Sequence, residues 1–235
     1  MKGNKQMFFP MWLDPTWLLL IPAFIVTIWA QAKVSSTYKK YSQVAVRSGV
    51  TGREFAQSML QRNDISGVGV QSIAGNMTDN FDPRTNIVSL SEGVYAKNSV
   101  ASVAIAAHEC GHVLQKFKKY GPMKARNAIV PIVNIASNLA MPLILIGILF
   151  STMAVLVDIG AWIYFAVVIF QLITLPVEFN ASKRAMANIS ASGVLTEQEQ
   201  TEAKRMLSAA AMTYVAAMLA SFLSFLRLFL ISRRR

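Results

Sequence analysis

The sequence of 235 residues is poor in the side chains that build disulfides, metal clusters and charged surfaces. It contains one cysteine, Cys110, so an intramolecular disulfide is excluded and a reducing compartment is favoured. Histidine occurs twice, and only 12 residues are aspartate or glutamate. Charged residues make up 15% of the chain, below the share of about 25% in soluble domains, whereas hydrophobic residues make up 54%. This scarcity of charge argues against a single soluble domain.

The apolar residues concentrate in four stretches, which are Trp12–Ala32, Ile129–Val157, Ala161–Val177 and Ala209–Ile231. A membrane-spanning helix needs about 20 predominantly apolar residues. We therefore expect a transmembrane helix at residues 10–32, a transmembrane hairpin at 129–177 and a fourth transmembrane or membrane-associated helix with a basic tail at 209–235. The alternative for the first stretch is a cleavable signal peptide, because Ala30–Ala32 fit a small-x-small cleavage site. We favour a retained anchor, because the charged start lies far from the apolar run.

The net charge of +11 is concentrated beside the apolar stretches. The clustered residues are Lys33, Lys39, Lys40 and Arg47 after the first stretch, and Lys116, Lys118, Lys119, Lys124 and Arg126 before the second. Such an excess marks the cytoplasmic side of a membrane protein. A complete fourth span would place Arg233, Arg234 and Arg235 on the opposite side, against this rule. The basic residues are not interleaved with aromatic ones, so no nucleic-acid partner is expected.

Two polar blocks separate the apolar stretches. In residues 33–128 a capping box at Thr51 and Glu54 begins a helix, and Gly67–Gly75 and Asn86–Ser91 have strand character. A longer helix follows from Asn98 or Ser99 and stops before Gly121-Pro122. Residues 178–208 are expected to form two short helices, broken at Ser192-Gly193. The fold class predicted is a mostly α-helical membrane protein with a small α+β domain.

Both histidines lie in His108-Glu109-Cys110-Gly111-His112, an H-E-x-x-H motif on a predicted helix. Positions i and i+4 share one helix face, so the two imidazoles can bind one zinc ion. Glu109 would accept a proton from a water that the metal activates. The alternative is a chance match in an apolar helix, but the small residues upstream and the use of both histidines favour a metal site. Cys110 points away from the ligand face and is expected to pack in the core.

A catalytic zinc needs a third protein ligand. No histidine remains, so the third ligand should be a carboxylate. Several acidic residues fit helix caps, exposed helix faces or the wrong end of a membrane segment: Glu54, Glu197, Glu199, Glu202, Asp14 and Asp158. Asp79 and Asp82 lie in a predicted turn and would at most support the ligands. Glu92 and Glu178 remain, and we favour Glu178 because it follows the third apolar stretch directly. Ser182, four residues later, can hydrogen-bond a ligand histidine.

The segments "TDNFDPRTNIVSLSEGVYAKNSVASVAIAAHECGHVLQ" and "EFNASKRA" together resemble the YugP-type bacterial membrane zinc metallopeptidases, relatives in layout of the HtpX-type membrane proteases. The similarity runs from about residue 10 to residue 230. It implies an endopeptidase of the cytoplasmic membrane with one zinc ion held by His108, His112 and Glu178, and with Glu109 as the base. The resemblance also implies that the α+β domain is a zincin-like catalytic domain. Ser182 stands where the HtpX-type pattern has an aspartate, as it does in the YugP-type motif. Asn80 and Phe81 stand where the YugP-type turn usually has His and Tyr, so the resemblance implies no role of this turn in metal or proton handling.

The remaining site predictions concern the substrate. An extended peptide would pair with Val88, Ser89 and Leu90 if Asn86–Ser91 were an edge strand, although this segment also fits an ordinary sheet strand. Arg184 would stabilise the oxyanion, or else pair with a carboxylate or lipid headgroups. Tyr214 is a weaker candidate for the oxyanion.

The leading hypothesis is therefore a multi-pass zinc endopeptidase in a bacterial cytoplasmic membrane, with its active site facing the cytoplasm. Its partners would be the lipid bilayer, a protein or peptide substrate and, because the polar part is small, a membrane partner protein that selects substrates. The alternatives are a catalytically silent scaffold that retains the site, and a transporter with an intramembrane metal. The nearly charge-free apolar stretches disfavour a transporter.

Overall fold

The computed structural model describes residues 15–150, 153 and 155–233. Four long helices dominate it: α1 (Leu20–Tyr41, preceded by the 3₁₀ turn η2, Pro15–Leu19), α5 (Gly121–Leu149), α6 (Val155–Ser192) and α7 (Glu197–Arg233). Each is long and apolar enough to cross a membrane. Large apolar side chains on these helices face outward, among them Phe24, Ile132, Leu139 and Trp162. The mostly helical membrane fold predicted from composition is confirmed.

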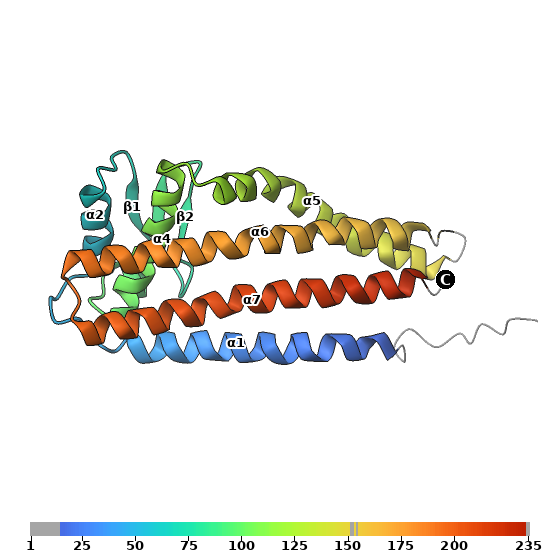
Figure 1. Cartoon of the computed structure of the whole chain (residues 1–235), viewed down its shortest axis with the longest axis horizontal. Coiled ribbons are helices and arrows are strands. Elements are labelled where there is room, and N and C mark those ends of the chain that lie inside the picture. The colour runs from blue at the N-terminus through green and yellow to red at the C-terminus, as the bar shows by residue number, and fades with distance from the viewer. Residues whose placement is uncertain (1–14, 151–152, 154, 234–235) are drawn as a thin grey trace, which may run out of the picture.

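The four helices lie side by side, with α7 between α1 and α6, and with α5 packed on the other side of α6 (Figure 1). The small α+β part covers one end of this bundle, and α7 ends near the opposite end. Helix α7 runs unbroken over 37 residues, so the charge of Arg233 lies far from the α+β part. The predicted conflict with the charge rule therefore persists at this end.

Two helix boundaries differ from the prediction. The segment after residue 178 is not a separate short helix, because α6 continues without a break from Val155 through Pro176 to Ser192. The break at Gly193 is present, where the backbone adopts a left-handed conformation with φ +65°. Gly121 and Pro122 do not simply end the preceding helix. They begin α5, where a proline in the first turn leaves no helical hydrogen bond unmade.

The α+β part contains α2 (Gly52–Arg62), β1 (Gly69–Ile73), β2 (Asn80–Asp82), β3 (Ile87–Ser91), α3 (Glu92–Tyr95) and α4 (Val100–Phe117). The predicted capping box at the start of α2 is confirmed by reciprocal hydrogen bonds between Thr51 and Glu54. Ser99 caps α4 by accepting a hydrogen bond from the Ser102 N–H. Fully buried side chains such as Phe55 and Leu90 join α2, the sheet and α4 into one core.

The strand order is β1-β3-β2, so β3 is the central strand. It pairs in parallel with β1 and antiparallel with β2. The prediction that Val88, Ser89 and Leu90 form an edge strand for the substrate is therefore wrong, because both edges of β3 are occupied and these side chains are buried. Both β2 and β3 contact the motif helix α4, and of these two strands β2 is the one at an edge of the sheet.

Candidate metal centre

The two histidines come from the middle of α4, and the carboxylate comes from α6. Helix α4 can approach α6 closely because Gly111 has no Cβ, and one built there would lie 2.5 Å from the Ala181 carbonyl oxygen. The His108 Nε2 lies 3.3 Å from the Glu178 Oε2, and the His112 Nε2 lies 3.5 Å from the same oxygen. All three side chains offer ligand atoms within 4.8 Å of one another. The structure thus brings together the three residues that the sequence singled out.

These distances fit a zinc ion. Ligand atoms placed tetrahedrally at about 2.0–2.1 Å from zinc lie about 3.3 Å apart, close to the two distances observed. Two imidazoles and one carboxylate are a donor set typical of catalytic zinc, and this set leaves a fourth position open. The other carboxylate considered, Glu92, begins α3 and is exposed. The donor chemistry and spacing therefore support zinc at His108, His112 and Glu178.

In each histidine Nε2 faces Glu178, and the second ring nitrogen, Nδ1, has a hydrogen-bonding partner of its own. The Ser182 Oγ lies 3.2 Å from the His108 Nδ1, as the sequence spacing suggested. The His112 Nδ1 lies 3.0 Å from the Oε1 of Gln115, a fully buried residue one turn further along α4. An amide oxygen only accepts hydrogen bonds, so the His112 Nδ1 carries the proton and Nε2 keeps its lone pair for a metal. Gln115 was not among the residues predicted from the sequence, although a glutamine in an apolar helix one turn after a candidate ligand was a usable signal.

The buried amide of Gln115 is itself fixed by α6. Its Nε2 donates to the Val177 carbonyl at 2.7 Å and to the Asn180 Oδ1 at 3.1 Å. The Arg184 Nε donates to the same Asn180 oxygen at 2.7 Å. This chain of hydrogen bonds defines which end of each amide is the oxygen, and so which nitrogen of His112 is protonated.

Arg184 does not reach the metal centre. Its guanidinium is bonded to Asn180 and lies over the Tyr120 ring, and it does not line the cavity beside the ligands. The predicted oxyanion role is therefore not supported. Six residues along a continuous helix correspond to about 240° of rotation from Glu178, so the two side chains leave α6 on different faces.

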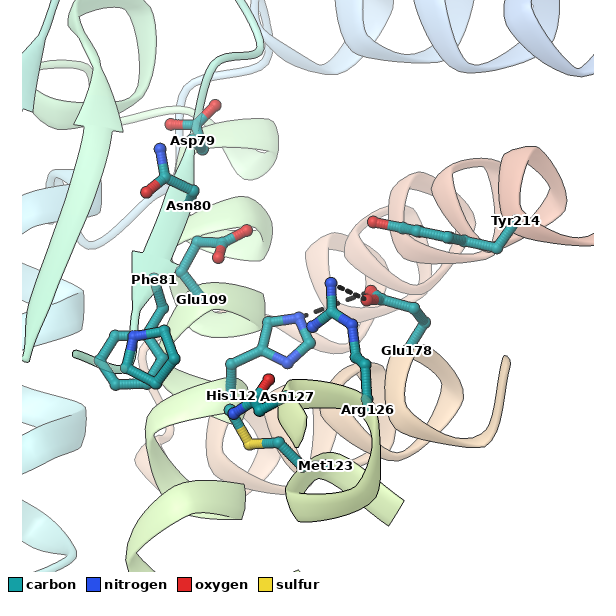
Figure 2. Close-up of a pocket in the computed structure, with 11 residues that line it drawn as sticks. Asp79, Asn80, Phe81, Glu109, His112, Met123, Arg126, Asn127, Glu178 and Tyr214 are labelled. Carbon is teal, nitrogen blue, oxygen red and sulfur yellow. Dashed lines mark ion pairs between the residues drawn. The ribbon is translucent and has the colours of Figure 1, made fainter. Parts of the chain in front are cut away.

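A different arginine occupies the position expected of Arg184. The Arg126 Nη2, from the first turns of α5, lies 3.8 Å from the Glu178 Oε1. Tyr214, on α7, faces the same carboxylate from the opposite wall (Figure 2). Both line a polar cavity of about 130 Å³ together with Glu109 and His112. Arg126 was read in the sequence only as part of a basic flank, because its pairing depends on how α5 packs.

Glu109 projects from α4 into this cavity, between the β2 side and the ligands (Figure 2). Its side chain is buried, and burial raises the pKa of Glu109 above its usual value, although the two neighbouring histidines partly offset this. The adjacent Cys110 points into the core, where its Sγ lies 3.7 Å from the Ala56 carbonyl oxygen. Burial raises the pKa of Cys110, so its thiol stays protonated.

The two acidic residues of the predicted turn, Asp79 and Asp82, have different surroundings. Asp79 lines the cavity, and its Oδ1 accepts hydrogen bonds from the Ser91 N–H at 2.7 Å and from the Ser91 hydroxyl at 3.1 Å. Asp82 instead accepts a hydrogen bond from the exposed Arg84 N–H at 2.8 Å. Asn80 and Phe81 also line the cavity, at the two positions where the resemblance departs from the usual family pattern.

The chain is similar to known proteins over most of its length. Residues 16–233 match the model of the family described as "Putative neutral zinc metallopeptidase". The chain is 44% identical over 213 residues to the "Putative membrane protease YugP" of Bacillus subtilis (strain 168), covering 91% of this chain and 94% of that protein. No solved structure matches the chain. The family match spans the membrane helices as well as the metal centre, so the protein belongs to this family of zinc metallopeptidases.

Proposed function

We propose that this protein is a membrane-embedded zinc endopeptidase that hydrolyses peptide bonds with water. The observation that carries the proposal is the position of Glu109, a buried carboxylate that faces the same cavity as His112 and Glu178. A catalytically silent scaffold would need neither this carboxylate nor an open cavity beside the ligands. A transporter would need ionisable groups along the spans.

The residues of the cavity have complementary roles. His108, His112 and Glu178 hold the zinc ion, which acts as a Lewis acid and activates water when bound. Glu109 accepts the proton of the attacking water and then donates it to the leaving amine. Arg126 and Tyr214 face the cavity and stabilise the negative charge that develops on the carbonyl oxygen of the substrate.

The substrate strand is best accommodated by β2 rather than by β3. β2 is an edge of the sheet, and its residues Asn80 and Phe81 line the cavity. An extended peptide can add to such an edge through main-chain hydrogen bonds. The turn after β2 is fixed to α4, because the Lys116 ammonium contacts the Pro83 carbonyl oxygen and lies 2.6 Å from the Asn86 Oδ1. These two contacts hold the end of β2 against α4.

The distribution of charge supports a cytoplasmic active site in a bacterial cytoplasmic membrane. The basic residues that flank the α+β part, including Lys39, Lys40, Lys118 and Lys119, outnumber those described at the far ends of the spans, Arg227 and Arg233. A membrane partner protein that delivers substrates remains part of the proposal, because the polar part of the chain is small.

The experiment compares wild type with Glu109→Gln, both purified in detergent and loaded with zinc. Wild type should cleave denatured casein, and the variant should bind zinc equally well but cleave about 10²–10⁴ times more slowly. Glu178→Ala should lose zinc, whereas the matched control Glu92→Gln, at an exposed position, should keep both zinc and activity. A wild-type protein with stoichiometric zinc and no cleavage of any protein would favour the scaffold.

A further inference from the structure

A second cavity of about 120 Å³ adjoins the metal centre, and its chemistry differs from that of the first. Its walls are mostly apolar, from Val34 of α1, Ile105 of α4, and Met206, Leu207 and Ala210 of α7. The residues Asp79, Glu109 and Tyr214 line both cavities. The two cavities are therefore adjacent and share the wall formed by these three side chains, and we call them the polar arm and the apolar arm of the site.

The ligand pair lies where the two arms meet. His112 lines the polar arm, and His108 lines the apolar arm. A peptide bond hydrolysed at this point would have the residue on one side of the bond in the polar arm and the residue on the other side in the apolar arm. Val34, Met206 and Leu207 are buried in the fold, so packing restricts the side chains of this part of the wall.

The direction of β2 determines the direction in which a paired substrate peptide would run. Met77, before β2, lines only the apolar arm, whereas Phe81 and Pro83 line only the polar arm. A peptide paired antiparallel to β2 would run from the polar arm to the apolar arm. The residue that follows the scissile bond would then occupy the apolar arm.

From this geometry we propose that the apolar arm is a specificity pocket for an aliphatic side chain immediately C-terminal to the scissile bond. The proposal rests on the proposed peptidase function and adds its substrate class. An apolar cavity of about 150 Å³ accommodates a benzene molecule, so a space of this order suits leucine, methionine or valine and excludes tryptophan. The carboxylates of Asp79 and Glu109 also line this arm and disfavour an acidic side chain there.

The test measures cleavage and binding separately. Cleavage products of a mixed decapeptide library are sequenced by mass spectrometry, and the new N-termini should be leucine, methionine, valine or isoleucine. Binding to the zinc-loaded Glu109→Gln protein is measured for two peptide hydroxamates that differ only in an isobutyl or a methyl side chain. The isobutyl compound should bind at least about tenfold more tightly, as expected for added methylene groups in an apolar pocket.

Two variants change the pocket in opposite directions. Ala210→Phe fills the apolar arm and should shift cleavage towards alanine or glycine at the new N-terminus and abolish the preference for the isobutyl hydroxamate. Leu207→Ala widens it and should admit phenylalanine. Ser208→Phe adds the same bulk at an exposed position on the same turn of α7 and should change neither measurement.

The possible results separate this proposal from the peptidase function. Cleavage without aliphatic preference, together with equal hydroxamate affinities, would overturn the pocket and leave the peptidase in place. Preferential binding of the isobutyl compound without any cleavage would support the pocket and overturn the peptidase. An aliphatic preference on the N-terminal side of the bond would overturn the assignment of the apolar arm to the following residue.

Discussion

Replacing Gly111 by alanine tests whether the metal centre depends on close contact between α4 and α6. The added Cβ would lie 2.5 Å from the Ala181 carbonyl oxygen and 3.1 Å from its carbonyl carbon. Ordinary contacts between a carbon and a carbonyl oxygen are about 3.3–3.6 Å, so the helices must separate by about 0.8 Å or more. The obstructing atoms are backbone, which cannot move aside as a flexible side chain does.

This separation is large compared with the tolerance of a metal site. Zinc ligands keep their distances within about 0.2 Å, and Gly111 is adjacent to His112 while Ala181 lies three residues after Glu178. We expect zinc affinity to fall about 10–100-fold, the range found when the support of ligands is disturbed. Overpacking of this kind also costs about 1–3 kcal/mol in the free energy of unfolding.

Zinc affinity is measured by competition with a chromophoric chelator, and stability is measured by denaturant unfolding of the zinc-free protein. Gly121→Ala is the matched control, because a Cβ built at Gly121 meets nothing within 4 Å. It should leave zinc binding unchanged. If Gly111→Ala bound zinc within twofold of wild type and retained full activity, the inference that this contact sets the ligand geometry would be refuted.

Three further predictions follow from the same contacts. Gln115→Met should weaken zinc binding about 10–100-fold and increase the Nε2-protonated tautomer of His112, visible in the ¹⁵N shifts of its ring; an unchanged tautomer would contradict the positioning role. Burial raises the pKa of Asp79, so ionisation costs stability as pH rises from its ordinary value of 3.8 through the raised pKa. Over that pH interval the free energy of unfolding of wild type should therefore fall relative to that of Asp79→Asn, which has no carboxyl group to ionise at this position. A difference between the two proteins that does not depend on pH would refute this. Removing zinc with a chelator should cost wild type about 2.7 kcal/mol relative to zinc at 100 times its dissociation constant, but should not affect the unfolding of Glu178→Gln.

The three residues that the structure groups at the candidate metal centre could be predicted from sequence because so few residues were eligible. Two histidines at helical spacing defined half of the site, and the shortage of carboxylates left Glu178 and Glu92 for the remainder. Ser182 followed from Glu178 by helical periodicity. These inferences needed only local geometry, and they did not depend on how the helices pack.

The strand order could not be predicted, because the alternation of apolar and polar residues in β3 wrongly suggested that one face of this strand is exposed to solvent. Ser89 and Ser91 look like solvent-facing positions, but both are buried and hydrogen-bonded. The Gln71 Nε2 donates to the Ser89 Oγ at 3.1 Å, and the Ser91 hydroxyl donates to Asp79. A polar residue that finds a partner in a neighbouring segment satisfies its hydrogen bonds without facing water. That partner is visible only in the folded structure.

Arg126 and Arg184 also show that contacts which depend on helix packing could not be predicted from the sequence. Arg184 is close to Glu178 in sequence but lies on another face of α6, whereas Arg126 is 52 residues away and lies beside it. The face on which Arg184 lies could not be predicted, because a helix break was expected near Glu178. The angle between two side chains around a helix axis follows from their spacing only if the helix is continuous. The position of Arg126 depends on the packing of α5 against α6, which apolar stretches alone do not specify.

The continuity of α6 also explains where the metal centre lies. Glu178 comes 23 residues after Val155, which is roughly 35 Å along a helix that rises about 1.5 Å per residue. Tyr214 comes 19 residues before Arg233, or roughly 28 Å along α7. Both distances are close to the hydrocarbon thickness of about 30 Å, counted from the ends remote from the α+β part. If the spans begin at those remote ends, the two helices bring Glu178 and Tyr214 to the same level, where the bilayer would give way to water. The proposed endopeptidase would meet the juxtamembrane segments of other proteins at that level, and the proposed aliphatic pocket would suit the apolar residues at the ends of membrane spans.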